Sequence, residues 1–206
     1  MSNISFIGLG GMTRAIATRA VAGGHTIEVI GRDAAKAEAL AAELGDQVAA
    51  GTFGETPAGN MVVLAVPYTS AEEVLAQYGD ALAGKVVIDI SNTFDAEANL
   101  ITPDGTFGAK EIAGWLPADA TVVKAFNTVF GHVLAQGGSL DVLFAGDDTH
   151  AKAMVSAFIE SLGLRPLDAG GLNMARYLES VGPLLIGLAQ HGVGSFNLAL
   201  KVDVVA

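Results

Sequence analysis

Three glycines near the start of the chain have the types and spacing that could hold a pyrophosphate group. Gly8, Gly10 and Gly11 follow an apolar run and precede an alanine-rich stretch with helical periodicity. In the G-x-G-x-x-G pattern the first glycine permits a tight turn. The second lets the backbone approach the phosphates, which then face the free N–H groups of the following helix. The sequence therefore predicts a dinucleotide-binding turn, with an ordinary glycine turn as the alternative, formed by Gly8, Leu9, Gly10, Gly11, Met12 and Thr13, where Thr13 replaces the third glycine.

The end of the second apolar run indicates which nicotinamide dinucleotide the turn would hold. Folds that bind NAD usually place an acid there, but this run ends in Gly31 and Arg32, and Glu28 lies in its middle. An arginine can fork onto a 2′-phosphate, and Lys36 could add a second positive charge. We expect NADP(H), with Gly31 leaving room and Asp33 capping the next helix. A solvated Arg32 is the alternative.

Further strand ends carry small and amide side chains. Ligands of open parallel sheets bind outside the carboxyl ends of the strands. Small residues and amides there suit a nicotinamide ribose and carboxamide, although an asparagine in such a place can equally close a turn. The residues selected by this argument are Ala65, Val66, Pro67, Asn92, Ala125 and Asn127.

Short apolar runs alternate with segments of helical periodicity along the whole chain. The expected strands are 3–8, 26–31, 61–66, 86–90, 121–125, 140–145 and 164–167, and the expected helices are 11–22, 33–44, 69–78, 106–115, 148–161 and 171–190. The alternation predicts an α/β fold, a doubly wound and mostly parallel Rossmann sheet with a small helical C-terminal part. A change of composition near 131–138 predicts a boundary between an NADP-binding domain, 1–130, and a smaller C-terminal part, 131–206.

Composition narrows the classes of partner. The chain has 206 residues, a net charge of −11, no basic run and no cysteine. These properties argue against nucleic acid or an anionic membrane as partner and exclude disulfides and thiolate chemistry. No signal peptide or membrane span is recognised, so a cytoplasmic protein is expected. No spacing suggests a metal site. His25 is expected at the surface. For His132 and His191 there are two alternatives, a role in the substrate cleft and a role in packing or at the surface.

Three segments beyond the glycine turn carry a resemblance to the coenzyme F420-dependent NADP oxidoreductase family. They are 124–129; 142–148 with Ala151 and Lys152; and 163–170 with Ala175, Arg176, Glu179 and 183–185. The tail after Gly192 also resembles the closing strand of that family. Its members exchange hydride between NADPH and an 8-hydroxy-5-deazaflavin. The same motifs are similar to the cytoplasmic NADPH domain of the six-transmembrane epithelial antigen metalloreductases, which passes hydride to a flavin.

The resemblance implies roles for particular residues. Residues 8–13, Arg32 and Lys36 would hold NADP(H), and Val66, Pro67, Val129 and Gly131 would pack around the nicotinamide, in a cleft closed by 192–196. Because hydride passes directly between stacked rings, no catalytic side chain is expected. The resemblance implies a small-molecule ring as acceptor, coenzyme F420 or a flavin. A reductase of a small carbonyl or imine substrate, and a non-catalytic NADP-binding module, are the alternatives.

The C-terminal region also predicts self-association. The apolar helix expected at 171–190 and the apolar tail 198–206 would leave a large exposed patch on a monomer. A homodimer formed through this region is expected.

Overall fold

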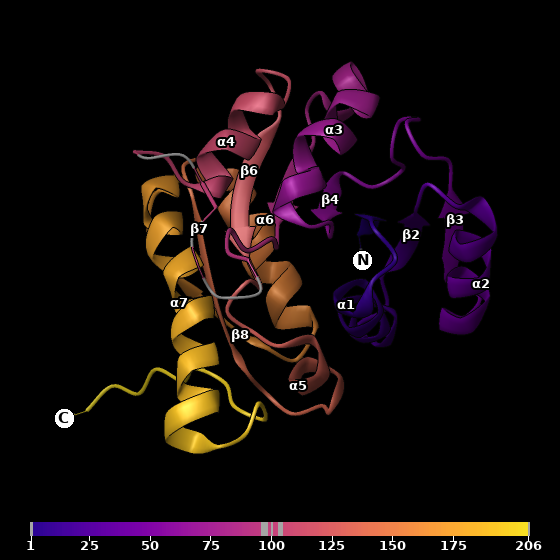
Figure 1. Ribbon diagram of the computed structural model, residues 1–206. Coiled ribbons are helices and arrows are strands. Elements are labelled where there is room, and N and C mark those ends of the chain that lie inside the picture. Colours follow the sequence, from indigo (N-terminus) through magenta and orange to yellow (C-terminus); the bar gives the residue numbers. More distant parts are fainter. Residues whose placement is uncertain (1, 96–98, 100, 103–104, 206) are drawn as a thin grey trace.

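The computed structural model describes residues 2–95, 99, 101–102 and 105–205 and shows one sheet covered by helices on both faces (Figure 1). The described part of the chain forms eight strands in the order β3-β2-β1-β4-β5-β6-β7-β8. All neighbouring strands are parallel except β6 and β7. The strands are β1 Asn3–Ile7, β2 Thr26–Ile30, β3 Val48–Gly51, β4 Met61–Leu64, β5 Val86–Asp89, β6 Thr121–Ala125, β7 Asp141–Gly146 and β8 Arg165–Asp168.

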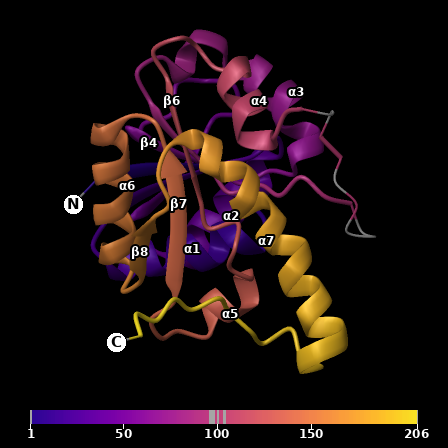
Figure 2. The same cartoon turned by 90° about the vertical axis from the view of Figure 1, so that its left-hand side faces the viewer.

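The helices divide between the two faces of this sheet. They are α1 Gly11–Ala22, α2 Ala34–Leu44, α3 Tyr68–Tyr78, α4 Gly108–Trp115, α5 Gly131–Ala135, α6 Thr149–Ser161 and α7 Ala175–Gly187. One apolar core joins the strands to α1, α2, α5 and α6, and a second joins them to α3 and α4. A small third cluster joins Phe107 and Ala109 to Ala175 of α7. The lower half of α7 extends beyond the sheet, and the tail that follows it turns back under β7 (Figure 2). The predicted doubly wound α/β fold is confirmed.

Most of the predicted elements are present, but several details differ. The strand β3 was not predicted, because Val48–Gly51 offers one large apolar residue and pairs only with β2 at the edge of the sheet. The five-residue helix α5 was also missed, since five residues are too few to show helical periodicity. The helix expected at 171–190 is a 3₁₀ turn, Leu172–Met174, then α7, then a π-helical turn, Leu188–Val193, that follows Pro183 inside α7.

The expected closing strand in the tail is wrong. The described residues after Gly194 form no strand, because side chains rather than a strand edge satisfy the tail backbone. The Val202 N–H donates to Asp141 Oδ2 over 2.7 Å, and the Arg165 guanidinium donates to the Val202 carbonyl. Arg165 also forms a two-bond ion pair with Asp141, which holds the pKa of that carboxyl below its usual range. This pair therefore fastens the tail beside β7 and β8.

His25 is buried, at 6% exposure, and not at the surface as expected. It lies between α1 and β2, and its ring packs edge-on against Phe158 of α6. Its Nδ1 accepts the Ser2 N–H over 3.2 Å, and its Nε2 lies 2.7 Å from the Ser161 hydroxyl. The Gly-Gly-His sequence indicates a turn but not the helix that covers it. His25 is thus part of the packing between the chain start and α6.

We predict that His25 makes the protein less stable below pH 6.5. Burial lowers the pKa of His25, so the unfolded chain binds a proton at a higher pH than the folded chain does. Stability should therefore fall as pH drops from 7.5 to 5.5, a window in which ordinary carboxyls stay ionised. Thermal melting of wild type and His25→Gln at both pH values checks this. The melting temperature of the variant should fall less on acidification than that of the wild type. An equal fall in the two proteins would contradict the role given to His25.

Candidate functional site

The glycine turn after β1 is held in a conformation that requires glycine. Gly8 has φ +116°, and its N–H donates to the Ile30 carbonyl over 2.9 Å. A Cβ on Gly8 would lie 2.2 Å from the Ala65 carbonyl oxygen. The Thr13 hydroxyl, buried where the pattern has its third glycine, donates to the Gly8 carbonyl over 2.8 Å. Thr13 thus ties the first turn of α1 to the glycine turn.

Space is open in front of this turn. Gly10 is the N-cap of α1, and a Cβ on Gly10 or Gly11 would meet no atom within 4 Å. A cavity of about 330 Å³ adjoins the turn. It is lined by Ile7, Gly8, Leu9, Gly10, Ile30, Gly31, Arg32, Asp33, Phe53, Ala65, Val66, Pro67, Ser70 and Val74. This arrangement fits a dinucleotide. The free N–H groups of the helix and the open glycines suit its phosphates, and the adjoining cavity suits its adenosine.

The structure places Arg32 at the rim of this cavity, with an exposed side chain. Asp33 caps α2 as predicted, accepting the Lys36 N–H over 3.2 Å. The Lys36 ammonium lies 3.3 Å from the same carboxylate, and both side chains are largely exposed. Glu28 does not line the cavity, and its carboxylate accepts from the Ser5 hydroxyl and the Ala58 N–H. Arg32 therefore stands at the tip of β2, and the acid beside it, Asp33, is engaged in capping α2.

The strand ends on the other side of the turn bring two predicted amides together. The Asn127 amide donates to Asn92 Oδ1 over 3.1 Å, and the Asn92 amide donates to the Asn127 carbonyl over 3.2 Å. Asn127 also donates to the Leu178 carbonyl of α7 over 2.8 Å. Just before it, Phe126 has φ +60°, a conformation that non-glycine residues rarely adopt and that often marks functional sites.

Three buried polar atoms at these strand ends find no hydrogen-bond partner in the described part of the chain: Ser91 Oγ, Asn127 Oδ1 and Thr128 Oγ1. Orphaned acceptors and hydroxyls of this kind call for an explanation. The amide and hydroxyl groups of a nicotinamide riboside have the chemistry to pair with them.

The other predicted site residues lie near the glycine turn or near the two amides. Val66 and Pro67 line the cavity beside Gly8, whereas Ala125 is fully buried within the sheet. Val129 is buried, and a Cβ on Gly131 would lie 3.0 Å from Met12 Sδ. The start of α5 therefore abuts the first turn of α1.

A buried charge cluster beneath the amides was missed by sequence reasoning. Lys124 and Asp89 are fully buried and lie 2.8 Å apart, and Glu179 of α7 lies 3.1 Å from the same ammonium. A signal was present for two of the three, because Asp89 and Lys124 stand in short strands that otherwise carry no charge, and a buried charge needs a partner. The partners become visible only when β5 and β6 are placed side by side.

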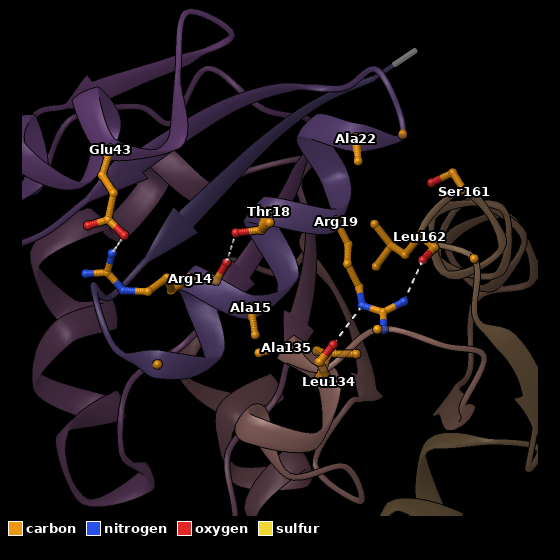
Figure 3. Close-up of a pocket in the computed structure, with 14 residues that line it drawn as sticks. Arg14, Ala15, Thr18, Arg19, Ala22, Glu43, Leu134, Ala135, Ser161 and Leu162 are labelled. Atoms are coloured by element: carbon orange, nitrogen blue, oxygen red, sulfur yellow. Dashed lines mark hydrogen bonds and ion pairs between the residues drawn. The ribbon is translucent and has the colours of Figure 1, made fainter.

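A hollow of about 660 Å³ lies on the outer face of α1, between the ends of α2, α5 and α6 (Figure 3). Its two arginines are already engaged. Arg14 pairs with Glu43, and Arg19 donates to the carbonyls of Leu134, Leu162 and Gly138. This hollow therefore offers no available arginine, in contrast to the cavity beside Gly8, where Arg32 is exposed.

His132 and His191, for which a role in the cleft was one of two expectations, lie in the C-terminal region and are exposed. His132 stacks on Phe130, with ring centroids 5.7 Å apart, and its Nε2 lies 3.0 Å from the Phe196 carbonyl. Among the described residues no group of three or more histidines or acids could hold a metal ion. Within those same residues, no helix has the length and apolarity needed to cross a membrane.

The fold and this site define a Rossmann-type dinucleotide-binding protein. The family model "NADP oxidoreductase coenzyme F420-dependent" matches residues 3–93. The F420-dependent NADP reductase of Methanothermobacter marburgensis is 30% identical over 200 residues, which cover 88% of this chain and 89% of that protein. The chain belongs to the coenzyme F420-dependent NADP oxidoreductase family, a family of NADP-dependent oxidoreductases.

Other relatives share only part of their length. Metalloreductase STEAP3 of Rattus norvegicus is 33% identical over 182 residues, covering 86% of this chain but 36% of that protein. The match to the F420-dependent NADP reductase of Methanocaldococcus jannaschii covers 63% of this chain and 62% of that protein. A crystal structure from Arthrobacter sp. FB24, provisionally named an F420-dependent NADP reductase, superposes with a TM-score of 0.87 at 25% identity. It covers 98% of this chain and 100% of its own.

Proposed function

We propose that this protein binds NADP(H) along the carboxyl ends of β1, β2, β4, β5 and β6 and transfers hydride between it and a deazaflavin or flavin-like ring. The observation that carries the proposal is the open glycine turn with Arg32 at the rim of its cavity. Family membership supports it. We assign the cofactor contacts to Gly8, Leu9, Gly10, Gly11, Met12, Gly31, Arg32, Lys36, Ala65, Val66, Pro67, Asn92, Asn127, Val129 and Gly131. Thr13 and Ala125, which have no exposed surface, would support these residues from beneath.

In this proposal the chain binds and orients, while the nicotinamide supplies the hydride. The N–H groups of α1 hold the pyrophosphate, and Arg32 holds the 2′-phosphate as a fork of donors. Asn92 and Asn127 fix the nicotinamide end, so that one face of its ring meets the acceptor. Positioning two rings in contact needs no general acid or base, which agrees with a site built from amides, glycines and apolar side chains.

Anaerobic turnover with a panel of acceptors tests the proposal. NADPH absorbance is followed after addition of oxidised F420, FMN, FAD, or a small imine or ketone. We expect oxidation of NADPH with a ring acceptor at about 1 s⁻¹ or faster. Turnover only with an imine or ketone would assign a small-molecule reductase. Tight NADPH binding without turnover would assign a non-catalytic module, and either result would overturn the acceptor proposed here.

We also propose that the outer face of α7 forms a homodimer. Tyr177, Leu184 and Leu188 are spaced by seven and four residues, which places them on one face, and they are 59%, 58% and 42% exposed. Exposed apolar residues clustered in this way favour a protein interface.

Leu184→Glu should therefore convert a dimer into a monomer, because a buried unpaired carboxylate is costly at an interface. Size-exclusion chromatography with light scattering at micromolar concentration measures this. Ala42→Glu on the exposed face of α2 is the matched control and should stay dimeric. A monomeric wild type would contradict the proposal.

A further inference from the structure

The proposed function leaves the buried cluster around Glu179 without a role, although burying three charges is expensive. Lys124 and Asp89 have no exposed surface, and Glu179 is 2% exposed. Replacing buried ion pairs by apolar residues is often neutral or stabilising, so stability alone is a weak reason for such a cluster. What the cluster holds in place is therefore informative.

Glu179 joins helix α7 to three other elements. Its carboxylate accepts the N–H groups of Gly108 and Ala109 at the start of α4, each over 2.9 Å. It also accepts from the Thr93 hydroxyl over 3.1 Å and lies 3.1 Å from the Lys124 ammonium. The carboxylate thus receives four donors from α4, the turn after β5, and β6.

Lys124 and Asp89 fix the backbone of that same turn. The Lys124 ammonium donates to Asp89 Oδ2 over 2.8 Å and to the Ser91 carbonyl over 2.7 Å. The other oxygen of Asp89 accepts the Ser91 N–H over 2.8 Å. With Glu179 as third partner, the ammonium has used its three donors. Both backbone groups of Ser91 and the hydroxyl of Thr93 are therefore bound on either side of Asn92.

Helix α7 also sets the second amide. The Leu178 carbonyl, one residue before Glu179, accepts from Asn127, and Asn127 in turn donates to Asn92. A Cβ on Gly182, one turn later, would lie 2.5 Å from the Phe94 ring and 3.3 Å from Asn92 Oδ1. One face of α7 is therefore docked closely on both strand ends that carry the amides.

We infer that Glu179 is a positioning residue, which with Lys124 and Thr93 holds Asn92 and Asn127 in register for the nicotinamide end of the site. This inference rests on the proposed function. The site then has two halves, a nicotinamide half at the two amides and a 2′-phosphate half at the cavity beside Gly8 and Arg32. None of the cluster residues lines that cavity. Disturbing the cluster should affect the nicotinamide half and spare the 2′-phosphate half.

Two ligands distinguish these halves: NADPH, and 2′,5′-ADP, which lacks the nicotinamide riboside and the phosphate attached to it. Affinities for both are measured for wild type, Glu179→Gln, Thr93→Val and the control Lys152→Met. The control removes an ion pair with Asp168 on α6 and β8. We expect the three variants to bind 2′,5′-ADP with the affinity of the wild type. The advantage of NADPH over 2′,5′-ADP should fall by about 10-fold in Glu179→Gln and about 3-fold in Thr93→Val, which correspond to about 1.4 and 0.65 kcal/mol.

The outcomes separate the inference from the proposed function. An unchanged NADPH advantage in Glu179→Gln, or equal weakening of both ligands, overturns the positioning role. If Glu179→Gln does not fold, Thr93→Val decides by the same comparison, since it removes one hydroxyl and leaves every charge in place. A wild type that binds neither ligand contradicts the proposed function, and the inference with it.

Discussion

Alanine at Gly8 is expected to unfold or strongly destabilise the protein, whereas alanine at Gly10 is expected to leave it folded and to weaken cofactor binding strongly. Gly8 combines a positive φ with a Cβ position 2.2 Å from a carbonyl oxygen. The backbone strain and the overlap together cost about 2–6 kcal/mol. Gly10 has φ −78°, which alanine adopts freely, and its Cβ would point into open space.

The two variants therefore separate the fold from the site. Thermal melting should show a loss of about 5 °C or more for Gly8→Ala and a change within about 2 °C for Gly10→Ala. Titration with NADPH should show about 100-fold weaker binding for Gly10→Ala, about 2.7 kcal/mol, because the methyl group takes up pyrophosphate space. Gly114→Ala, on α4 with nothing within 4 Å of its Cβ, is the control. Wild-type NADPH affinity in Gly10→Ala would show that the phosphates do not lie there.

Arg32→Ala should weaken NADPH binding by about 10- to 150-fold while NADH binding changes by less than about 3-fold. The range corresponds to about 1.5–3 kcal/mol, the usual worth of hydrogen bonds to a charged group. The two cofactors differ because NADH lacks the 2′-phosphate to which the Arg32 guanidinium would donate hydrogen bonds. Equilibrium titrations with both cofactors, at one ionic strength, measure the difference.

A control for simple loss of charge is available in Lys85. This lysine stands just before β5, at the amino end of that strand and away from the carboxyl ends that form the site, and it donates to the Pro57 carbonyl. Lys85→Ala lowers the net charge of the protein by the same amount and should bind both cofactors as wild type does. Equal weakening of NADPH and NADH in Arg32→Ala would remove the assignment of Arg32 to the 2′-phosphate.

The parts of the fold that the sequence predicts well are those whose signal is local. Gly8 follows an apolar run directly and precedes a helix, so turn and helix are recognisable together. Asp33 and Asp148 each stand at the start of a helical pattern, and both accept the backbone N–H three residues later. Such caps need no information from the rest of the chain.

The parts that escaped prediction depend on distant partners. Asp89 and Lys124 are aligned in the register of β5 and β6, and Glu179 comes 55 residues after Lys124. Asp89 and Lys124 are visible as charges in strands that otherwise carry none, but only the assembled fold shows that they meet each other and Glu179. The tail gave the opposite error. Its apolar residues resemble a strand, yet the Asp141 carboxylate takes the backbone N–H that a neighbouring strand would have bound.

These observations assign different tasks to the two ends of the site. The glycine turn and Arg32 would give affinity and choice of cofactor, whereas α7 and its buried carboxylate would set the nicotinamide against the acceptor. The same helix carries the exposed apolar face proposed for the dimer. Self-association and nicotinamide positioning are therefore expected to depend on one element.

Equilibrium titration of the wild-type protein with NADPH and NADH, side by side at one ionic strength, tests the central claim most directly. The structure predicts that NADPH binds at least about 10-fold more tightly, a difference of about 1.4 kcal/mol that a guanidinium on the 2′-phosphate readily supplies. Equal affinities, or no binding of either dinucleotide, would contradict the account.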